Sequence, residues 1–184
     1  MRISIILTLL FWVSFFFHCV AQSPQSKVDP QKNIVFTIVL EELPATDEEI
    51  ILGVAEHLKK SYKETRYTIS TLEPHSIIGE GQFNSFFQSE NMVKSRIFNL
   101  PFQLRVDTKG NRARLLFIAR NYEIVELSDI GDKKTTLVLI SEAENTKLYK
   151  KAFKELESAA NRTLESLSET IKAISSKPTV SDDW

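Results

Sequence analysis

The sequence predicts an α+β fold whose elements follow in the order strand, helix, four strands, helix. Three observations predict it. Apolar and polar residues alternate strictly between residues 97 and 107, which is the period of a half-buried strand. Residues 47–63 and 142–175 instead repeat their apolar residues at helical spacing. The tight turn DTKGN joins two strands directly, so neighbouring strands are expected to run antiparallel.

The first strand and the first helix are expected at residues 34–41 and 47–63. In IVFTIVLE every second residue falls on the same face, as in a strand with a buried side. Thr46 stands three residues before Glu49, so hydroxyl and carboxylate can each bond the other residue's backbone amide. This capping box predicts the start of the helix. Its buried stripe is expected to comprise Ile50, Ile51, Val54, Ala55, Leu58 and Tyr62.

The middle of the chain predicts more strands. Residues 67–72 and 76–83 are expected as short strands separated by a turn at Pro74, which cannot donate to a strand ladder. Residues 94–122 are expected to form a long antiparallel hairpin that turns at Gly110. Residues 128–141 remain open between an extra strand and a packed connection.

A long helix is expected over residues 142–175, with Ser141 and Glu144 as a second capping box. Its apolar stripe is wide enough either to cover the sheet or to pair with a second copy of the chain. The sequence does not choose, so monomer and homodimer both stay open. Residues 34–175 are thus interpreted as one domain, and residues 176–184 as a loose tail.

The first residues predict export. An apolar run from Ile3 to Phe17 follows Arg2 and ends at an A-x-A-like site, so residues 1–21 are interpreted as a signal peptide cleaved near Ala21. The alternative is a lipidated Cys19, but bulky aromatic residues precede this cysteine where such a signal has small ones. Residues 22–33 are then a flexible leader. We expect a periplasmic or envelope-associated protein without a transmembrane span in its mature part.

The composition of the mature chain limits the kinds of catalytic and metal site that it can contain. With Cys19 in the signal peptide, the mature chain has no thiol, and its only histidines are His57 and His75. Neither stands in a zinc-protease motif, and no nucleophile elbow is present, so we expect no catalytic residue, no metal site and no cofactor. The chain has 23 Lys and Arg against 24 Asp and Glu, a balance that does not favour nucleic acid.

Three motifs resemble a known family. They are the capped helix TDEEIILGVAEHLKKSY, the strand SIIGEGQF and the paired strands LPFQLRVDTKGNRARLLFIAR, which together span about residues 33–125. The chain resembles an uncharacterised domain-of-unknown-function family of exported Gram-negative envelope proteins with a fold like the TATA-box-binding protein. The resemblance implies a curved antiparallel sheet with both helices on one face, and it implies no activity. A fold like that of the TATA-box-binding protein suggests DNA as a partner. The export signal and the balanced charge argue against DNA binding.

A candidate binding surface lies on the outward face of the hairpin. Guanidinium groups bind carboxylate or phosphate, and apolar neighbours suit an amphipathic ligand. The alternative is a solvated face whose apolar pair is covered by residues 128–141. The candidate residues are Arg105, Arg112, Arg114, Leu116, Ile118, Arg120 and Tyr122.

Two further features have two readings each. Phe86 and Phe87 fall in an expected loop over residues 83–92, which either folds back into the core or covers a hydrophobic pocket. Gly79 and Gly81 leave a gap on one strand face that suits helix packing or a ligand.

Together these features predict a non-enzymatic envelope domain that binds an unknown small amphipathic or anionic molecule or an envelope protein. The alternatives are an assembly module that uses its long helix for self-association and, less favoured, a hydrolase.

Overall fold

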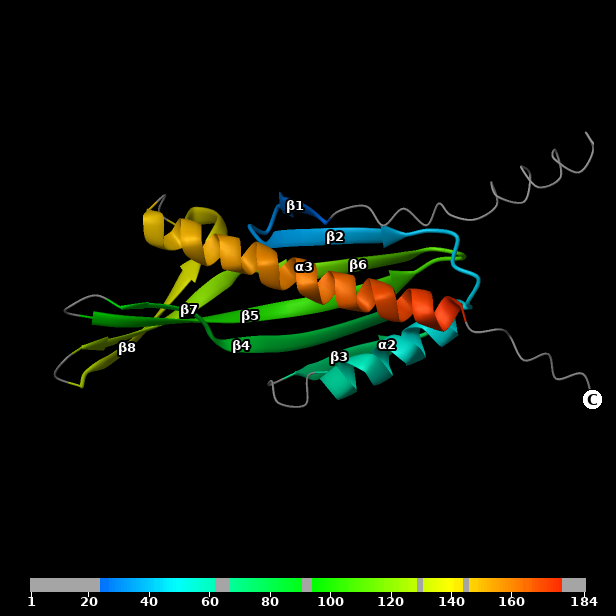
Figure 1. Ribbon diagram of the computed structural model, residues 1–184, viewed down its shortest axis with the longest axis horizontal. Coiled ribbons are helices and arrows are strands. Elements are labelled where there is room, and N and C mark those ends of the chain that lie inside the picture. The colour runs from blue at the N-terminus through cyan, green and yellow to red at the C-terminus, as the bar shows by residue number, and fades with distance from the viewer. Residues whose placement is uncertain (1–23, 62–66, 91–93, 129–130, 144–145, 177–184) are drawn as a thin grey trace, which may run out of the picture.

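The computed structural model describes residues 24–61, 67–90, 94–128, 131–143 and 146–176, which form one antiparallel sheet and two long helices (Figure 1). Residues 1–21, with Cys19, and nearly all of the expected tail lie outside the described residues. The elements are β1 (Gln25–Val28), β2 (Ile34–Leu40), α2 (Asp47–Ser61), β3 (Thr68–Glu73), β4 (Ser76–Glu90), β5 (Lys94–Thr108), β6 (Ala113–Ala119), β7 (Asn121–Ser128), β8 (Lys133–Leu139), a 3₁₀ turn η1 (Ile140–Glu142) and α3 (Lys147–Ser175).

The long strand β5 organises the sheet. The strand order is β1-β2-β6-β5-β4-β3, and β7 pairs with both β5 and β8. The second half of β5 pairs with β6 and its first half with β7, so β6 and β7 run along it as one strand interrupted at Arg120. The Arg120 carbonyl accepts a hydrogen bond from the Ile140 amide at 3.0 Å, which holds the end of β8 at this interruption.

Both helices lie on the same face of the sheet, as the resemblance implies (Figure 1). Their apolar stripes are buried in one core with the inward residues of the strands. The stripe of α3 therefore packs against the sheet and α2. We call the other face of the sheet, which carries neither helix, the open face.

The two helix starts differ in how well the sequence predicts them. The Thr46–Glu49 capping box is present, with the Glu49 carboxylate accepting from the Thr46 amide at 2.8 Å. The prediction of a second capping box at Ser141 and Glu144 is wrong. Helix α3 begins at Lys147, and the Thr146 hydroxyl caps it by accepting a hydrogen bond from the Tyr149 amide. Ser141 instead donates to the Lys32 carbonyl at 2.9 Å, and Glu144 lies outside the described residues.

Two segments are more ordered than expected. Residues 25–28 of the expected flexible leader form β1, which pairs with β2 through its backbone while all four side chains stay exposed. The turn that follows is held by Asp29, whose carboxylate accepts from the Gln31 and Asn33 amides at 2.9 and 2.8 Å. For residues 128–141 the sequence left two alternatives, and the structure has the extra strand there, β8.

Candidate functional site

The pairing of β2, β6 and β5 brings four predicted residues together on the open face. Leu116 lies opposite Arg105 on β5 and Thr37 on β2, and Ile118 follows two residues later on the same face. Arg114 precedes them by two residues and is also directed outward. Leu116 and Ile118 are half-buried, although neither α2 nor α3 covers this face of the sheet. The result is a short apolar strip with guanidinium groups at one end.

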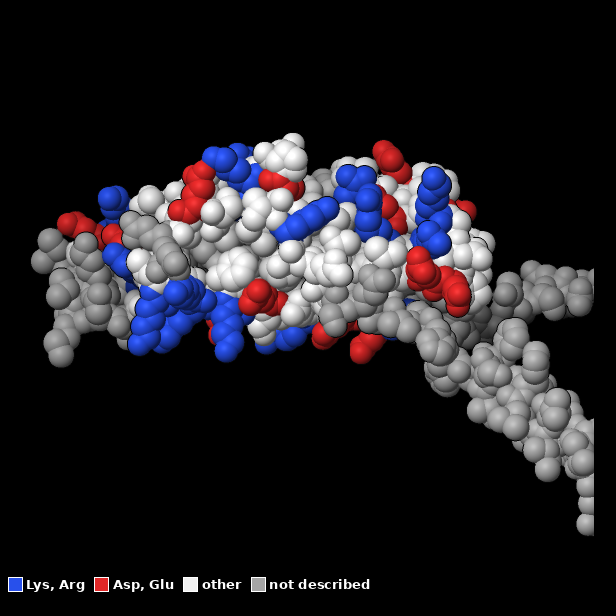
Figure 2. All heavy atoms as spheres, turned by 90° about the horizontal axis from the view of Figure 1, so that it is seen from above, with Lys and Arg blue, Asp and Glu red and all other residues white. Residues whose placement is uncertain are grey.

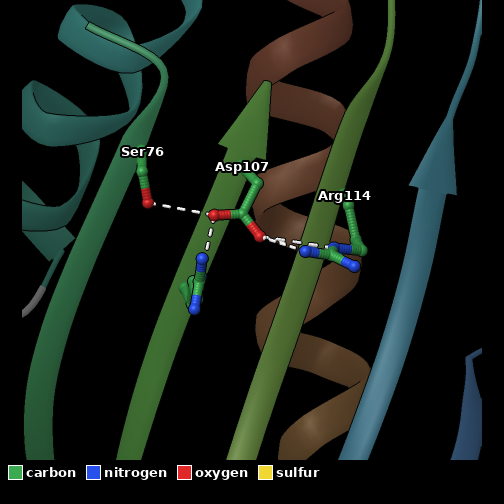
Figure 3. Close-up of polar contacts among 4 residues, drawn as sticks. Ser76, Asp107 and Arg114 are labelled. Carbon is green, nitrogen blue, oxygen red and sulfur yellow. Dashed lines mark hydrogen bonds and ion pairs between the residues drawn. The ribbon is translucent and has the colours of Figure 1, made fainter. Parts of the chain in front are cut away.

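A carboxylate that the sequence analysis did not single out organises these arginines. Asp107 Oδ1 accepts from Arg105 Nε at 2.7 Å and from the Ser76 hydroxyl at 3.0 Å, and Oδ2 accepts from Arg114 Nη2 at 2.7 Å. Figure 3 shows Asp107 on its strand between Ser76 and Arg114, which come from the strands on either side. We call these four residues the Asp107 cluster. The sequence could have predicted this cluster, because the turn at Gly110 sets the hairpin register and that register places Asp107 opposite Arg114.

The charge state of this cluster follows from its contacts. Burial of Asp107 alone would raise the pKa of its carboxyl, but hydrogen bonds from Arg114, Arg105 and Ser76 outweigh burial and lower that pKa below its ordinary value. Asp107 is therefore ionised at neutral pH, and the cluster keeps one net positive charge. Arg105 contacts Asp107 through Nε. This bond orients the guanidinium group, while its two terminal nitrogens donate no hydrogen bond to that carboxylate.

A hollow of about 470 Å³ lies at the other end of the apolar strip, where β6 gives way to β7. Ile118 lines it together with Arg120, and Glu80 and Gln103 contribute polar groups. The open face thus presents, along one line, the Asp107 cluster, the strip Leu116–Ile118 and the hollow with Arg120. Strand β8 extends the sheet by pairing with β7, so its residues 133–139 do not cover Leu116 and Ile118 as the alternative expected.

Two of the predicted residues lie elsewhere. Arg112 lies at the hairpin end and pairs with Glu41 at 3.5 Å rather than joining the cluster. Tyr122 is wrong as a surface residue: it is fully buried and packs edge-on against Phe98 at 5.6 Å between ring centroids. The interruption at Arg120 shifts the alternation by one residue, which turns Tyr122 inward. Burial raises the pKa of its hydroxyl.

Phe86 and Phe87 belong to the core rather than to a loop over a pocket. They lie on β4, where a bulge between Phe83 and Phe87 changes the register. Ser85 takes a positive φ of 50° there, and its amide donates to the Asn99 side chain at 2.9 Å. The bulge places both rings on the helix side, where Phe87 contacts Phe98 and Phe86 stacks near Tyr122.

The two glycines of β4 make room for aromatic rings, not for a helix. A Cβ at Gly79 would lie 1.8 Å from Tyr67 Oη, and one at Gly81 would lie 2.5 Å from Phe102 Cζ. The rings of Tyr67 and Phe102 lie over this gap, with their centroids 6.5 Å apart. The prediction that a helix packs against these glycines is therefore wrong, because aromatic side chains fill the gap instead.

Both histidines contact polar side chains of neighbouring elements. His57 lies between the helices, with Thr170 Oγ1 at 3.1 Å from Nδ1 and Ser61 and Ser166 Oγ at 3.3 Å from Nε2. His75 contacts the Asp47 carboxylate at 2.9 Å, where the β3–β4 turn meets the start of α2. Among the described residues, no group of three or more histidines and carboxylates is placed to hold a metal ion.

Comparisons with known proteins support the fold. No protein-family model and no curated protein matches the sequence. A solved TBP-like protein from Parabacteroides distasonis matches with a TM-score of 0.52 and 14% identity, covering 83% of this chain and 98% of its own. A DUF4468 family protein from Bacteroides ovatus matches with a TM-score of 0.51 and 14% identity, covering 83% and 94%.

These matches concern the fold alone, because identity is low. In the part of the chain that the structure describes, no helix is both long and apolar enough to cross a membrane. The predicted α+β class, with both helices on one face, and the structural resemblance to the domain-of-unknown-function family are confirmed. The chain has the TBP-like fold of these two proteins, a fold of unknown function.

Proposed function

We propose that the chain is a non-catalytic binding domain, exported to the cell envelope, whose open face holds a small amphipathic ligand or a partner protein. The observation that carries this proposal is the apolar strip Leu116–Ile118, which lies on the sheet face that carries neither α2 nor α3. Apolar side chains on such a face favour a ligand or partner that shields them from water.

The polar groups at the two ends of the strip define the complementary chemistry. At one end Asp107 holds Arg105 and Arg114 in fixed orientations, and at the other Arg120 lines the hollow. Pre-oriented guanidinium groups bind a carboxylate or phosphate at a lower entropy cost than free ones. Because Glu80 lines the same hollow as Arg120, the net positive charge lies at the Asp107 cluster. The expected partner group therefore has an apolar segment with an anionic group at the end that meets this cluster.

The export part of the proposal rests on the sequence. The apolar run Ile3–Phe17 with the small residues up to Ala21 supports a signal peptide. The absence of catalytic motifs in the sequence supports a binding role rather than a reaction.

Native mass spectrometry of the chain, purified without detergent from the envelope of an expressing Gram-negative host, tests this proposal. We expect a non-covalent component bound to the wild type and absent from the double variant Leu116→Gln, Ile118→Gln. The matched control is Leu52→Gln, which replaces an apolar residue that is 54% exposed on α2, in the helix layer. A component kept by the open-face variant and lost by the control would overturn the proposal.

A further inference from the structure

Four lysines form a stripe along the exposed side of the first turns of α3. They stand at helical spacing, so they share one face over about 10 Å of helix. Each is exposed. Figure 2 shows Lys and Arg side chains gathered at the end of the molecule where α3 begins. The lysine stripe comprises Lys147, Lys150, Lys151 and Lys154.

Lys147 and Lys150 lie in the first turn of α3, where their charge opposes the stability of the helix. The first turn of a helix favours acidic residues, because its backbone dipole is positive there. The other helix obeys this rule, with Asp47, Glu48 and Glu49 in its first turn and lysines in its last. In α3 the first turn has no acidic residue. Helix stability therefore does not explain the lysines of the first turn.

The stripe is also not neutralised by its neighbours. Elsewhere lysines pair with carboxylates, as Lys60 does with Glu56 and Lys32 with Glu142. Within the described residues none of the four stripe lysines takes part in an ion pair. From Lys147 to Glu155 the helix carries four lysines and one glutamate, a formal net charge of +3 in a chain whose total is −1.

A hollow of about 410 Å³ lies beside the first turn of α3, where Thr146, Leu148 and Tyr149 of the helix start meet Arg96, Glu126 and Lys134 of the sheet. Arg96 pairs with Glu126 at 2.6 Å, and Lys134 lies opposite Glu126 in the β7–β8 register, so the sheet side carries a formal net charge of only +1. The main positive surface is therefore the lysine stripe itself. It consists of point charges on long flexible stems, without a shaped cradle for one defined anion.

We propose that the lysine stripe rests on the anionic phospholipid headgroups of a membrane. A helix face with several lysines and no fixed geometry suits a fluid layer of phosphates, to which each lysine adds a similar increment of attraction. The inference rests on the export part of the proposed function, in which the apolar run Ile3–Phe17 brings the chain to a membrane. Helix α3 and the open face lie on opposite sides of the sheet (Figure 1), so a domain bound to a membrane through α3 keeps the open face accessible.

Vesicle co-sedimentation tests this inference, with the chain purified after export from an expressing cell. The probes are phosphatidylcholine vesicles with and without about 30 mol % phosphatidylglycerol, at about 0.05 M and about 0.5 M salt, where screening shortens to ~4 Å. We expect binding to the anionic vesicles at low salt, loss of that binding at high salt, and weaker binding to the neutral vesicles throughout. An apolar N-terminal anchor would instead bind both vesicle types alike.

The quadruple variant K147Q/K150Q/K151Q/K154Q removes the stripe without removing good helix-forming residues. We expect its affinity for anionic vesicles to fall at least about tenfold, with an unfolding midpoint equal to or above that of the wild type. The matched control K27Q/K59Q/K60Q/K109Q removes the same charge from exposed sites on other elements and should bind as the wild type does. Equal loss in both variants, unchanged binding of the stripe variant, or binding to soluble polyglutamate but not to vesicles would each overturn the proposal.

Discussion

Asp107 and Arg114 face each other across the β5–β6 pair, with 2.7 Å between Oδ2 of the carboxylate and Nη2 of the guanidinium. Arg105 and Ser76 complete the cluster from β5 and β4, so one carboxylate joins three neighbouring strands. A charge-assisted network of this kind fixes the orientation of its arginines. It also ties the stability of the sheet to the ionisation of Asp107.

Replacing Asp107 by Asn is expected to destabilise the fold by about 1–2 kcal/mol at neutral pH, because two guanidinium groups lose their anion. The folded-state pKa of Asp107 is lowered, so its contribution is present above the unfolded value near 3.8 and is lost as pH falls through the folded pKa. Urea unfolding between about pH 2 and 7 should show a flatter acid limb in Asp107→Asn. An unchanged acid limb would contradict this assignment.

His57 is expected to make the helix pair sensitive to mild acid. Burial between α2 and α3 lowers its pKa below 6.5, so the unfolded chain takes up the proton first. Stability should therefore fall as pH drops below about 6.5, and His57→Asn should remove this part of the dependence. The control His75→Asn should keep it. If both variants follow the wild-type curve, His57 does not titrate as its position predicts.

Gly79→Ala is expected to destabilise the fold by about 2 kcal/mol, because the added methyl group would overlap the Tyr67 ring. The same substitution in a Tyr67→Ala background should cost clearly less, since the opposing ring is gone. A double-mutant cycle by urea unfolding measures this coupling. Equal costs in the two backgrounds would show that the ring does not occupy the gap.

Tyr122→Phe is expected to leave stability unchanged or raise it slightly, because within the described residues its buried hydroxyl has no hydrogen-bond partner. Tyr122→Ala, in contrast, should cost about 3–5 kcal/mol by opening a cavity in the aromatic core. Thermal unfolding of the two variants separates these effects. A loss above about 1 kcal/mol for the Phe variant would mean that the hydroxyl is satisfied.

Elements with strong apolar periodicity could be predicted from the sequence. The buried face of β5 alternates without a break from Phe98 to Val106. The described stripe residues of both helices are buried or partly buried, as their spacing predicts, while Tyr62 lies outside the described residues. Elements held mainly by backbone pairing could not. Strand β1 exposes all four side chains, and β8 exposes most of its seven, so neither leaves a clear apolar pattern.

The same physical limit explains the errors at the candidate site. Strict alternation predicts an outward Tyr122, but the interruption at Arg120 shifts the period by one, and no local signal marks that shift. The bulge at Ser85 likewise turns Phe86 and Phe87 to the same side, which alternation forbids. Arg105, Arg114, Leu116 and Ile118 keep the unbroken period, and their shared face was predicted.

The most direct test of the central claim places a photo-crosslinking amino acid at position 118 and, as the control, at position 52 on α2. The chain is exported in a Gram-negative cell, irradiated and analysed by intact mass. A binding role of the open face predicts an adduct of defined mass at position 118 and none at position 52. Adducts absent from position 118, or equal at both positions, would contradict it.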